Sequence, residues 1–162
     1  MDQHDIDSEL ASARELLDST SVGHLAYIAK DGAPRAIPVG FYWTGEQFVI
    51  STASTAPKVA ALLACPDVAL AIDAGGTPAQ ARVLSVRGRA NIRIVDGVVE
   101  EYLAAARKSM GAQAAAQFEQ NCRETYDRMA RIAITPRWVR YYDFGAGRLP
   151  RFLQELVERT GG

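Results

Sequence analysis

Residues 22–52 alternate short apolar runs with tight-turn dipeptides, and this pattern constrains the fold more than any other feature of the sequence. The segment reads VGHLAYIAKDGAPRAIPVGFYWTGEQFVIST, with Asp31-Gly32 and Thr44-Gly45 between the runs. Such pairs tolerate the positive backbone dihedral angles that tight hairpins use. The segment therefore predicts three consecutive strands in an antiparallel meander.

The rest of the chain adds strands and helices to this meander. Further strands are predicted over VALAID (68–73), over ARVLSVRGRANIRIV (81–95) with a bulge at Gly88, and as a pair around Pro136 in RIAITPRWVRYYDF (131–144). Helices are expected over residues 5–18, 57–64, 97–130 with a break near Gly111, and 149–159. Because a long bent strand often closes a barrel, we expect a small antiparallel barrel with helices packed outside it.

Length and composition indicate one domain, and the order of the expected strands and helices gives its class. A chain of 162 residues with 48% hydrophobic content can bury roughly two-thirds of its unfolded surface around one core. We expect a single domain over residues 1–162. Its class is α+β, mostly β with peripheral helices.

Charge and motif content exclude several function classes. The 18 Lys and Arg residues nearly balance 19 Asp and Glu residues, so no overall field favours nucleic acid or an anionic membrane. The start MDQHDIDSEL is acidic where a secretory signal would be basic, and no apolar run approaches the length of about eighteen residues that a membrane span needs. The two cysteines and two histidines complete no zinc spacing. We expect a cytoplasmic protein without a nucleic-acid partner, a membrane segment or a metal site.

A hydroxyl-rich turn before the helix at residue 57 is the strongest candidate site. Ser51, Thr52, Ser54 and Thr55 precede a helix that begins with Pro57-Lys58. Proline fits the first helical turn, and the free N–H groups at a helix start attract an anion. Lys58 adds a full positive charge, so the pattern predicts a phosphate site. The alternative is that Thr55 is only the N-cap and Lys58 a solvated surface residue.

Arg35 is the second candidate cation. It lies in the second strand of the expected meander, whose neighbour would be the strand that ends at Ser51-Thr52. In that register the guanidinium reaches the same pocket, where a charge-assisted hydrogen bond is worth roughly 1.5–3 kcal/mol. Its alternative role is as a partner for Asp31 or Glu46.

Two stretches of the chain resemble a known family. The run RAIPVGFYWTGEQFVISTASTAPKVAALLACPDVALAID is similar to the pyridoxamine 5′-phosphate oxidase-like, flavin-binding split-barrel family. The shared pattern is a strand with Arg, a strand ending in hydroxyls, Pro-Lys at a helix start, and Cys-Pro before the next strand. The C-terminal YYDFGAGRLPRF also resembles the family's ending. Residues 20–95 carry most of the likeness.

The resemblance implies an FMN-binding split β-barrel that acts as a homodimer with shared cofactor sites. FMN would be lined on one chain by Arg35, Ser51, Thr52, Pro57 and Lys58, with Lys58 on the phosphate. The partner chain would contribute Tyr142, Arg148 and Arg151. For Tyr142 the alternative is a place in a core aromatic cluster, and for Arg148 a capping or surface role.

The sequence also departs from the biosynthetic oxidase of this family. Gly40 stands where that enzyme has a lysine near the flavin ring, and Pro150 stands where it has a histidine for its substrate. The Tyr, Arg and Ser set for pyridoxamine phosphate is not clear in EEYLAAARKSMG (100–111). Oxidation of pyridoxamine phosphate is therefore not the expected activity.

The function predicted is that of a flavin-dependent oxidoreductase acting on a small organic substrate. The cofactor carries the hydride chemistry, and no side chain need act as a nucleophile, so no catalytic residue is assigned. One alternative is a reductase that uses the deazaflavin coenzyme F-420 in the same basic cup. Another is a non-catalytic carrier or sensor of flavin or haem, although His24 in a strand is a weak haem-ligand candidate.

Overall fold

The computed structural model describes residues 1–161 and has a seven-stranded antiparallel sheet with peripheral helices. The strand order is β2-β1-β5-β6-β7-β4-β3. The strands are β1 (Val22–Ile28), β2 (Pro34–Gly40), β3 (Tyr42–Trp43), β4 (Phe48–Ala53), β5 (Asp67–Ala74), β6 (Arg82–Asp96) and β7 (Arg128–Asp143). The α+β class predicted from the sequence is confirmed. Gly162, the last residue of the expected domain, lies outside the described residues.

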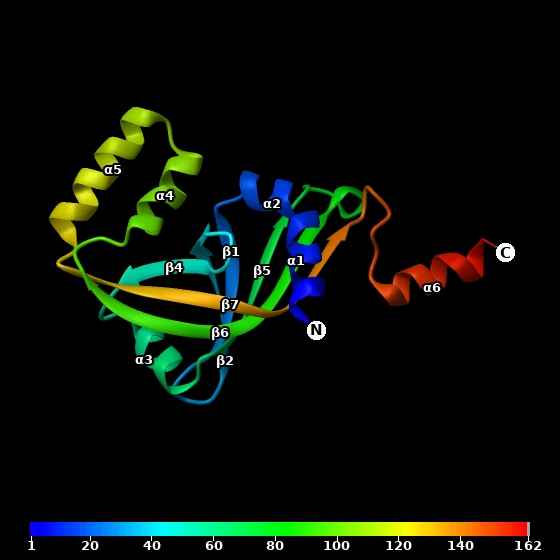
Figure 1. Ribbon diagram of the computed structural model, residues 1–162, viewed down its shortest axis with the longest axis horizontal. Coiled ribbons are helices and arrows are strands. Elements are labelled where there is room, and N and C mark those ends of the chain that lie inside the picture. The colour runs from blue at the N-terminus through cyan, green and yellow to red at the C-terminus, as the bar shows by residue number, and fades with distance from the viewer. Residues whose placement is uncertain (162) are drawn as a thin grey trace.

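Six α-helices surround the sheet within residues 1–161. They are α1 (Gln3–Ser12), α2 (Arg14–Ser19), α3 (Pro57–Ala64), α4 (Glu100–Ser109), α5 (Ala112–Thr125) and α6 (Arg151–Thr160), with a short 3₁₀ helix at Pro78–Gln80. Figure 1 shows α4 and α5 together at one end of the sheet, and α6 projecting from the opposite end. The single helix expected over residues 5–18 is two helices, because the chain breaks at Ala13. None of the helices in residues 1–161 is both long enough and apolar enough to span a membrane.

The chain crosses between the two edges of the sheet at Phe41, so the expected meander is wrong. β2 pairs with β1 in the register Tyr27↔Arg35, whereas β3 pairs with β4 in the register Trp43↔Phe48. Phe41 lies between β2 and β3 and is completely buried in the core. The chain leaves the edge strand β2 at Phe41 and directly enters β3 at the other edge. The sheet must therefore curve so that its two edges lie close together. The alternating pattern predicted the strands but not this change of partner.

The long strands β6 and β7 form the spine of the sheet (Figure 1). They pair along their whole length with a register shift at Arg87/Gly88, opposite Pro136. A Cβ at Gly88 would overlap the carbonyl oxygen of Thr135, which confirms the expected bulge. β7 is nevertheless one strand, not the two that were expected. Beyond Ile134 it no longer pairs with β4, and a proline is tolerated on such a free edge.

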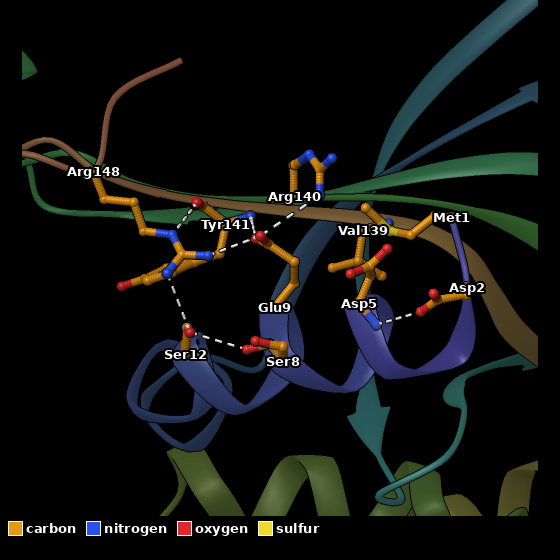
Figure 2. A network of polar contacts seen from close by, with 10 residues as sticks. All are labelled: Met1, Asp2, Asp5, Ser8, Glu9, Ser12, Val139, Arg140, Tyr141 and Arg148. Atoms are coloured by element: carbon orange, nitrogen blue, oxygen red, sulfur yellow. Dashed lines mark hydrogen bonds and ion pairs between the residues drawn. The ribbon is translucent and has the colours of Figure 1, made fainter. Parts of the chain in front are cut away.

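Helix α1 covers the edge of β7 that β4 leaves open (Figure 2). The backbone N–H of Tyr141 donates to Glu9 Oε2 at 2.7 Å, and that of Val139 donates to Met1 Sδ at 3.3 Å. Met1 and α1 thus supply acceptors that a neighbouring strand would otherwise provide.

Two apolar clusters lie on the two sides of β4. Phe48 and Ile50 join the main core inside the curved sheet. Val49 points the other way, into a second cluster beneath α4 and α5 that includes Leu103 and Met129. Successive side chains of β4 thus point to opposite faces of the sheet, and the same alternation applies to the candidate site residues at the end of this strand.

Candidate functional site

The start of α3 carries a positive charge that no group in residues 1–161 neutralises. Pro57 is the first helical residue, and the N-cap is Ala56, which offers no side-chain acceptor. Thr55 is therefore not the cap. Within residues 1–161, Lys58 forms no hydrogen bond or ion pair, although it is half-buried. Burial lowers the pKa of the Lys58 ammonium. An uncapped helix start beside an unpaired, partly desolvated lysine suits an anionic ligand.

Two pockets meet at Pro57. One, of about 330 Å³, is lined by Tyr27, Asp31, Arg35 and Pro57. The other, of about 560 Å³, is lined by Ser54, Thr55, Pro57, Leu63 and Ile94. Arg35 and the hydroxyl-rich turn thus lie on two sides of the same helix start.

Lys30 lines both pockets and was not among the predicted site residues. It is exposed and forms no ion pair within residues 1–161. It lies directly before Asp31 and Gly32, between β1 and β2. In the sequence, the only feature that could have identified Lys30 as a site residue is its place beside a tight turn, where a cation is usually solvated surface. Lys30 lines the two pockets because α3, which follows later in the chain, packs beside the turn that carries it.

Arg35 reaches the pocket by a route different from the predicted one. Its strand, β2, is hydrogen-bonded to β1 and lies across the sheet from β4, so the expected pairing with the strand of Ser51 and Thr52 is wrong. The guanidinium donates to Asp31 Oδ2 at 2.7 Å, which is the alternative role considered for it. Arg35 still lines the pocket with Pro57, because the curved sheet brings β2 beside α3.

Ser51 and Thr52 lie on opposite faces of the sheet, because successive side chains of a strand alternate. Ser51 pairs in register with Arg131, and its Oγ is buried without a hydrogen-bond partner in residues 1–161. Its register partner Arg131 is bound elsewhere, since its Nε and Nη2 atoms donate to Glu101 Oε1 at 2.8 and 2.6 Å. A buried hydroxyl without a hydrogen-bond partner is costly in free energy. Among the hydroxyls of this run, Ser51 Oγ is the one that is both buried and without a partner in residues 1–161.

The three residues expected from a partner chain lie far from α3 on their own chain. Tyr142 is near the end of β7, Arg148 follows that strand and bridges back to Asp143, and Arg151 begins α6, on the opposite side of the molecule from α3 (Figure 1). Arg148 donates to Glu9 Oε1 at 2.8 Å and to the carbonyl of Tyr141 at 2.8 Å (Figure 2). Arg151 pairs with Glu155 and is 90% exposed. Tyr142 is half-buried, while its neighbour Tyr141 belongs to the core. One chain alone does not bring these residues to the pockets at Pro57.

The residues at α3 fit the phosphate of a flavin nucleotide. An unpaired lysine, an uncapped helix start and two nearby hydroxyl residues offer a cation and several donors. The Ser51 Oγ is also unsatisfied, but it lies on the face of β4 that carries Val49 and lines neither pocket at Pro57. Among residues 1–161 no group of three or more His, Cys, Asp or Glu side chains could hold a metal ion.

The positions where the sequence departs from the biosynthetic oxidase have structural roles here. Tyr102 of α4 packs against Phe118 and Tyr126, with ring centroids 5.6 and 6.5 Å away. Pro150 is the N-cap of α6, and Gly40 ends β2. Tyr102, Pro150 and Gly40 therefore serve packing, helix capping and the end of a strand, and they do not form a binding set for pyridoxamine phosphate.

Comparison with known proteins gives a family and a fold. The sequence model of the family described as "Pyridoxamine 5'-phosphate oxidase" matches residues 10–143. No curated protein sequence matches the chain.

Three solved structures illustrate the likeness. An F420 reductase is 26% identical, with a TM-score of 0.58 over 78% of this chain and 94% of that one. A haem-binding protein from Mycobacterium smegmatis is 25% identical, with a TM-score of 0.59 over 89% of this chain and 56% of that one. A conserved hypothetical protein from Mycobacterium tuberculosis is 20% identical, with a TM-score of 0.60 over 93% and 90% of the two chains. The split-barrel fold predicted from the sequence is thereby confirmed.

Proposed function

Because this chain belongs to the pyridoxamine 5′-phosphate oxidase family, we propose that it is an FMN-dependent oxidoreductase acting on a small organic substrate. The observation that carries the proposal is the start of α3, where Lys58 is half-buried and unpaired beside an uncapped helix N-terminus. A charge in that position is stabilised when an anion binds.

In this proposal the protein anchors and orients the cofactor. Lys58 and the helix start hold the phosphate, although Lys58 itself lines neither pocket. Arg35 approaches the helix start from the smaller pocket, and Lys30 lines both pockets. Thr52 is assigned to the same site as a donor, whereas Ser51, which was expected there too, turns to the opposite face of β4 beside Arg131. When bound, FMN supplies the hydride chemistry, and the chain supplies binding, orientation and exclusion of water.

We further propose that the functional unit is a homodimer with two shared sites. On one chain Tyr142, Arg148 and Arg151 lie on the opposite side of the molecule from α3 (Figure 1). A second copy brings the same three residues to the flavin ring of the first. Arg151, which is 90% exposed, is free to make such a contact.

A deazaflavin coenzyme is the second candidate cofactor. The F420 reductase is 26% identical to this chain and is matched over 94% of its own length. Lys30 favours this alternative, because an exposed cation at the rim of both pockets suits a ligand with more negative charge than FMN.

A non-catalytic carrier is the third candidate. The haem-binding protein from Mycobacterium smegmatis shares 25% identity with this chain. His24, however, has a side chain that is 57% exposed on β1, and its Nδ1 lies 3.7 Å from Asp73. An exposed histidine on the outside of the sheet is poorly placed to be an axial haem ligand.

Titration of apo-protein with FMN and with coenzyme F420 separates these candidates. FMN binding is expected to perturb the flavin absorbance and quench its fluorescence, with a dissociation constant in the micromolar range or below. Tighter binding of F420 than of FMN selects the deazaflavin reductase. Binding of haem alone selects the carrier, and binding of none of the three contradicts the cofactor assignment.

A further inference from the structure

A cleft separates α1 from the turn between β3 and β4. Two cavities of about 430 and 550 Å³ occupy it, and they meet at Asp7, Leu10, Trp43 and Gly45. Each cavity has the size of a typical small-molecule pocket, about 300–1,000 Å³. Neither is lined by any residue of the two pockets at Pro57, so this cleft is distinct from the candidate cofactor site.

The cleft is open because neither β4 nor α1 pairs with the stretch of β7 around Pro136. The pairing of β7 with β4 ends at Ile134, and the hydrogen bonds to Met1 and α1 begin only at Val139. Thr135 and Pro136 lie between these points and line the larger cavity. Pro136 has no N–H to satisfy, which favours an open edge here.

Both walls of the cleft are fixed by hydrogen bonds. On the turn, the Thr44 hydroxyl oxygen accepts from the backbone N–H of Gln47 at 3.0 Å, and Gln47 Nε2 donates to Thr135 Oγ1 at 2.9 Å. On the helix, Glu9 accepts from the backbone N–H of Tyr141 at 2.7 Å (Figure 2). The cleft is therefore formed before a ligand binds, which lowers the entropic cost of binding.

The indole of Trp43 is a wall that the two cavities share. Trp43 is half-buried and packs against Phe48, with ring centroids 4.4 Å apart. The rest of the indole borders the cleft, where Leu10 of α1 adds apolar surface. An accessible indole face attracts organic cations through its π electrons and also binds apolar groups.

The charged side chains of the cleft leave an excess of negative charge. Arg14 and Asp18 line one end and lie 3.7 Å apart, so they neutralise each other. Asp7 and Glu46 line the opposite walls of the larger cavity, and neither forms an ion pair within residues 1–161. Asp7 accepts a hydrogen bond from the neutral amide of Gln3 at 2.7 Å. Two unpaired carboxylates beside an indole favour a ligand that has positive charge and an apolar body.

We propose that this cleft binds an alkyl diamine. Its ammonium groups pair with Asp7 and Glu46, and its hydrocarbon chain lies along Trp43 and Leu10. A diamine carries two positive charges separated by an apolar chain, so it matches both the carboxylates and the indole. An inorganic cation lacks the chain and a diol lacks the charge. The selectivity is opposite to that of the α3 site, which is suited to a phosphate.

The fluorescence of Trp43 tests binding directly. The chain has two tryptophans, so Trp138→Phe leaves Trp43 as the one fluorescent indole. Titration with 1,5-diaminopentane is expected to change the Trp43 emission in a saturable way. No saturable change with the diamine overturns the proposal.

Two further probes separate the chain from the charge. Mg²⁺ has the same charge without the hydrocarbon chain, and 1,5-pentanediol has the same chain without the charge. Each is expected to bind about tenfold more weakly than the diamine or worse, because each loses one of the two matched contacts. Equal affinity for the diamine and Mg²⁺ would mean that surface charge is merely screened, and it overturns the proposal.

Removal of the two carboxylates tests their role without disturbing the core. Asp7→Asn/Glu46→Gln is expected to weaken diamine binding about tenfold or more in isothermal titration. Glu155→Gln/Glu158→Gln on α6 is the matched control, because it removes the same charge away from the cleft. The control should leave the affinity unchanged, and equal losses in the two double variants overturn the proposal.

Substitution of Trp43 tests the aromatic contact. Trp43→Leu keeps an apolar side chain but removes the π face, so diamine affinity should fall severalfold. Trp43→Phe keeps an aromatic ring and should retain most of the affinity. The melting temperatures of both variants are measured alongside, because Trp43 also packs against Phe48. Wild-type affinity in a folded Trp43→Leu protein overturns the proposal.

Discussion

Arg35 donates a hydrogen bond of 2.7 Å to Asp31, four residues earlier, across the turn between β1 and β2. The other carboxylate oxygen accepts from the backbone N–H of Ala33 at 3.0 Å. The Ala33 N–H first, and then Arg35, lower the pKa of Asp31 below its ordinary value. Asp31 therefore stays ionised at neutral pH and competes with any anionic ligand for the guanidinium.

Substitution of Asp31 tests this competition. Asp31→Asn removes the charge that holds Arg35, so FMN affinity is expected to rise by a few-fold. Arg35→Ala should instead weaken FMN binding by about tenfold or more, the effect of a charge-assisted hydrogen bond worth roughly 1.5–3 kcal/mol. Isothermal titration measures both. Equal affinities of the two variants would show that Arg35 serves the turn and not the ligand.

Lys58→Ala separates ligand binding from a solvated surface role. A cation in the first turn of a helix is unfavourable by about 0.3–1 kcal/mol, so the melting temperature of the apo-protein should stay the same or rise. FMN affinity should fall about ten- to a hundredfold, because a contact of roughly 1.5–3 kcal/mol with the phosphate is lost. Riboflavin, which lacks the phosphate, is the matched ligand and should lose much less.

The pH dependence of the same variant follows from the lowered pKa of Lys58. Burial disfavours the charged form in the folded state, so the lysine reduces stability while it is charged and the loss is relieved as pH rises through its folded pKa toward 10.5. Any thermal gain of Lys58→Ala at pH 7 should therefore shrink in alkaline buffer. Scanning calorimetry between neutral and alkaline pH measures it.

Glu101→Gln breaks the ion pair beside Ser51. Glu101 and Arg131 are only 22% and 19% exposed, so loss of the charged hydrogen bonds should cost about 2 kcal/mol of unfolding free energy. Burial alone would raise the pKa of Glu101. The Arg131 guanidinium favours the charged carboxylate more strongly, so the pKa of Glu101 lies below its ordinary value of 4.5. The stabilisation is thus complete above about pH 4.5 and is lost as pH falls through the folded pKa. Urea unfolding at neutral and acidic pH should show the difference between wild type and variant shrink.

Glu100→Gln is the control for that experiment. Glu100 lies one residue away and pairs with Arg123 at 3.2 Å, but its side chain is 69% exposed. An exposed pair contributes about 0–1 kcal/mol. A loss for Glu100→Gln as large as that for Glu101→Gln would contradict the role given to burial.

Glu9 joins α1 to the free edge of β7. Glu9→Ala leaves the Tyr141 N–H without its acceptor and removes the carboxylate that pairs with Arg148. The change should cost roughly 2–3 kcal/mol of stability, or a fall in melting temperature of about 5–10 °C. Glu9→Gln keeps an oxygen for the Tyr141 N–H and should lose less. Glu15→Ala, whose side chain is 90% exposed, is the control and should be nearly neutral.

The sequence by itself determined the elements and the chemistry of the candidate site. Turn pairs such as Asp31-Gly32 predicted the strands, and Pro57-Lys58 after a run of hydroxyls predicted a helix start suited to phosphate. These signals are local, since they depend on residues a few positions apart. The bulge at Gly88 is of the same kind.

The tertiary structure alone decided which elements meet. Burial of Phe41 sends the chain from one edge of the sheet to the other, so Arg35 comes to the pocket from β2 beside α3 and not from a strand next to β4. The same curvature places Lys30 at both pockets. Strand alternation turns Ser51 and Thr52 to opposite faces, and Met1 and Glu9 supply acceptors to β7 at Val139 and Tyr141, beyond the end of its pairing with β4. These outcomes depend on contacts between residues far apart in the chain, and the core that forms on folding selects among pairings that local patterns leave equally open.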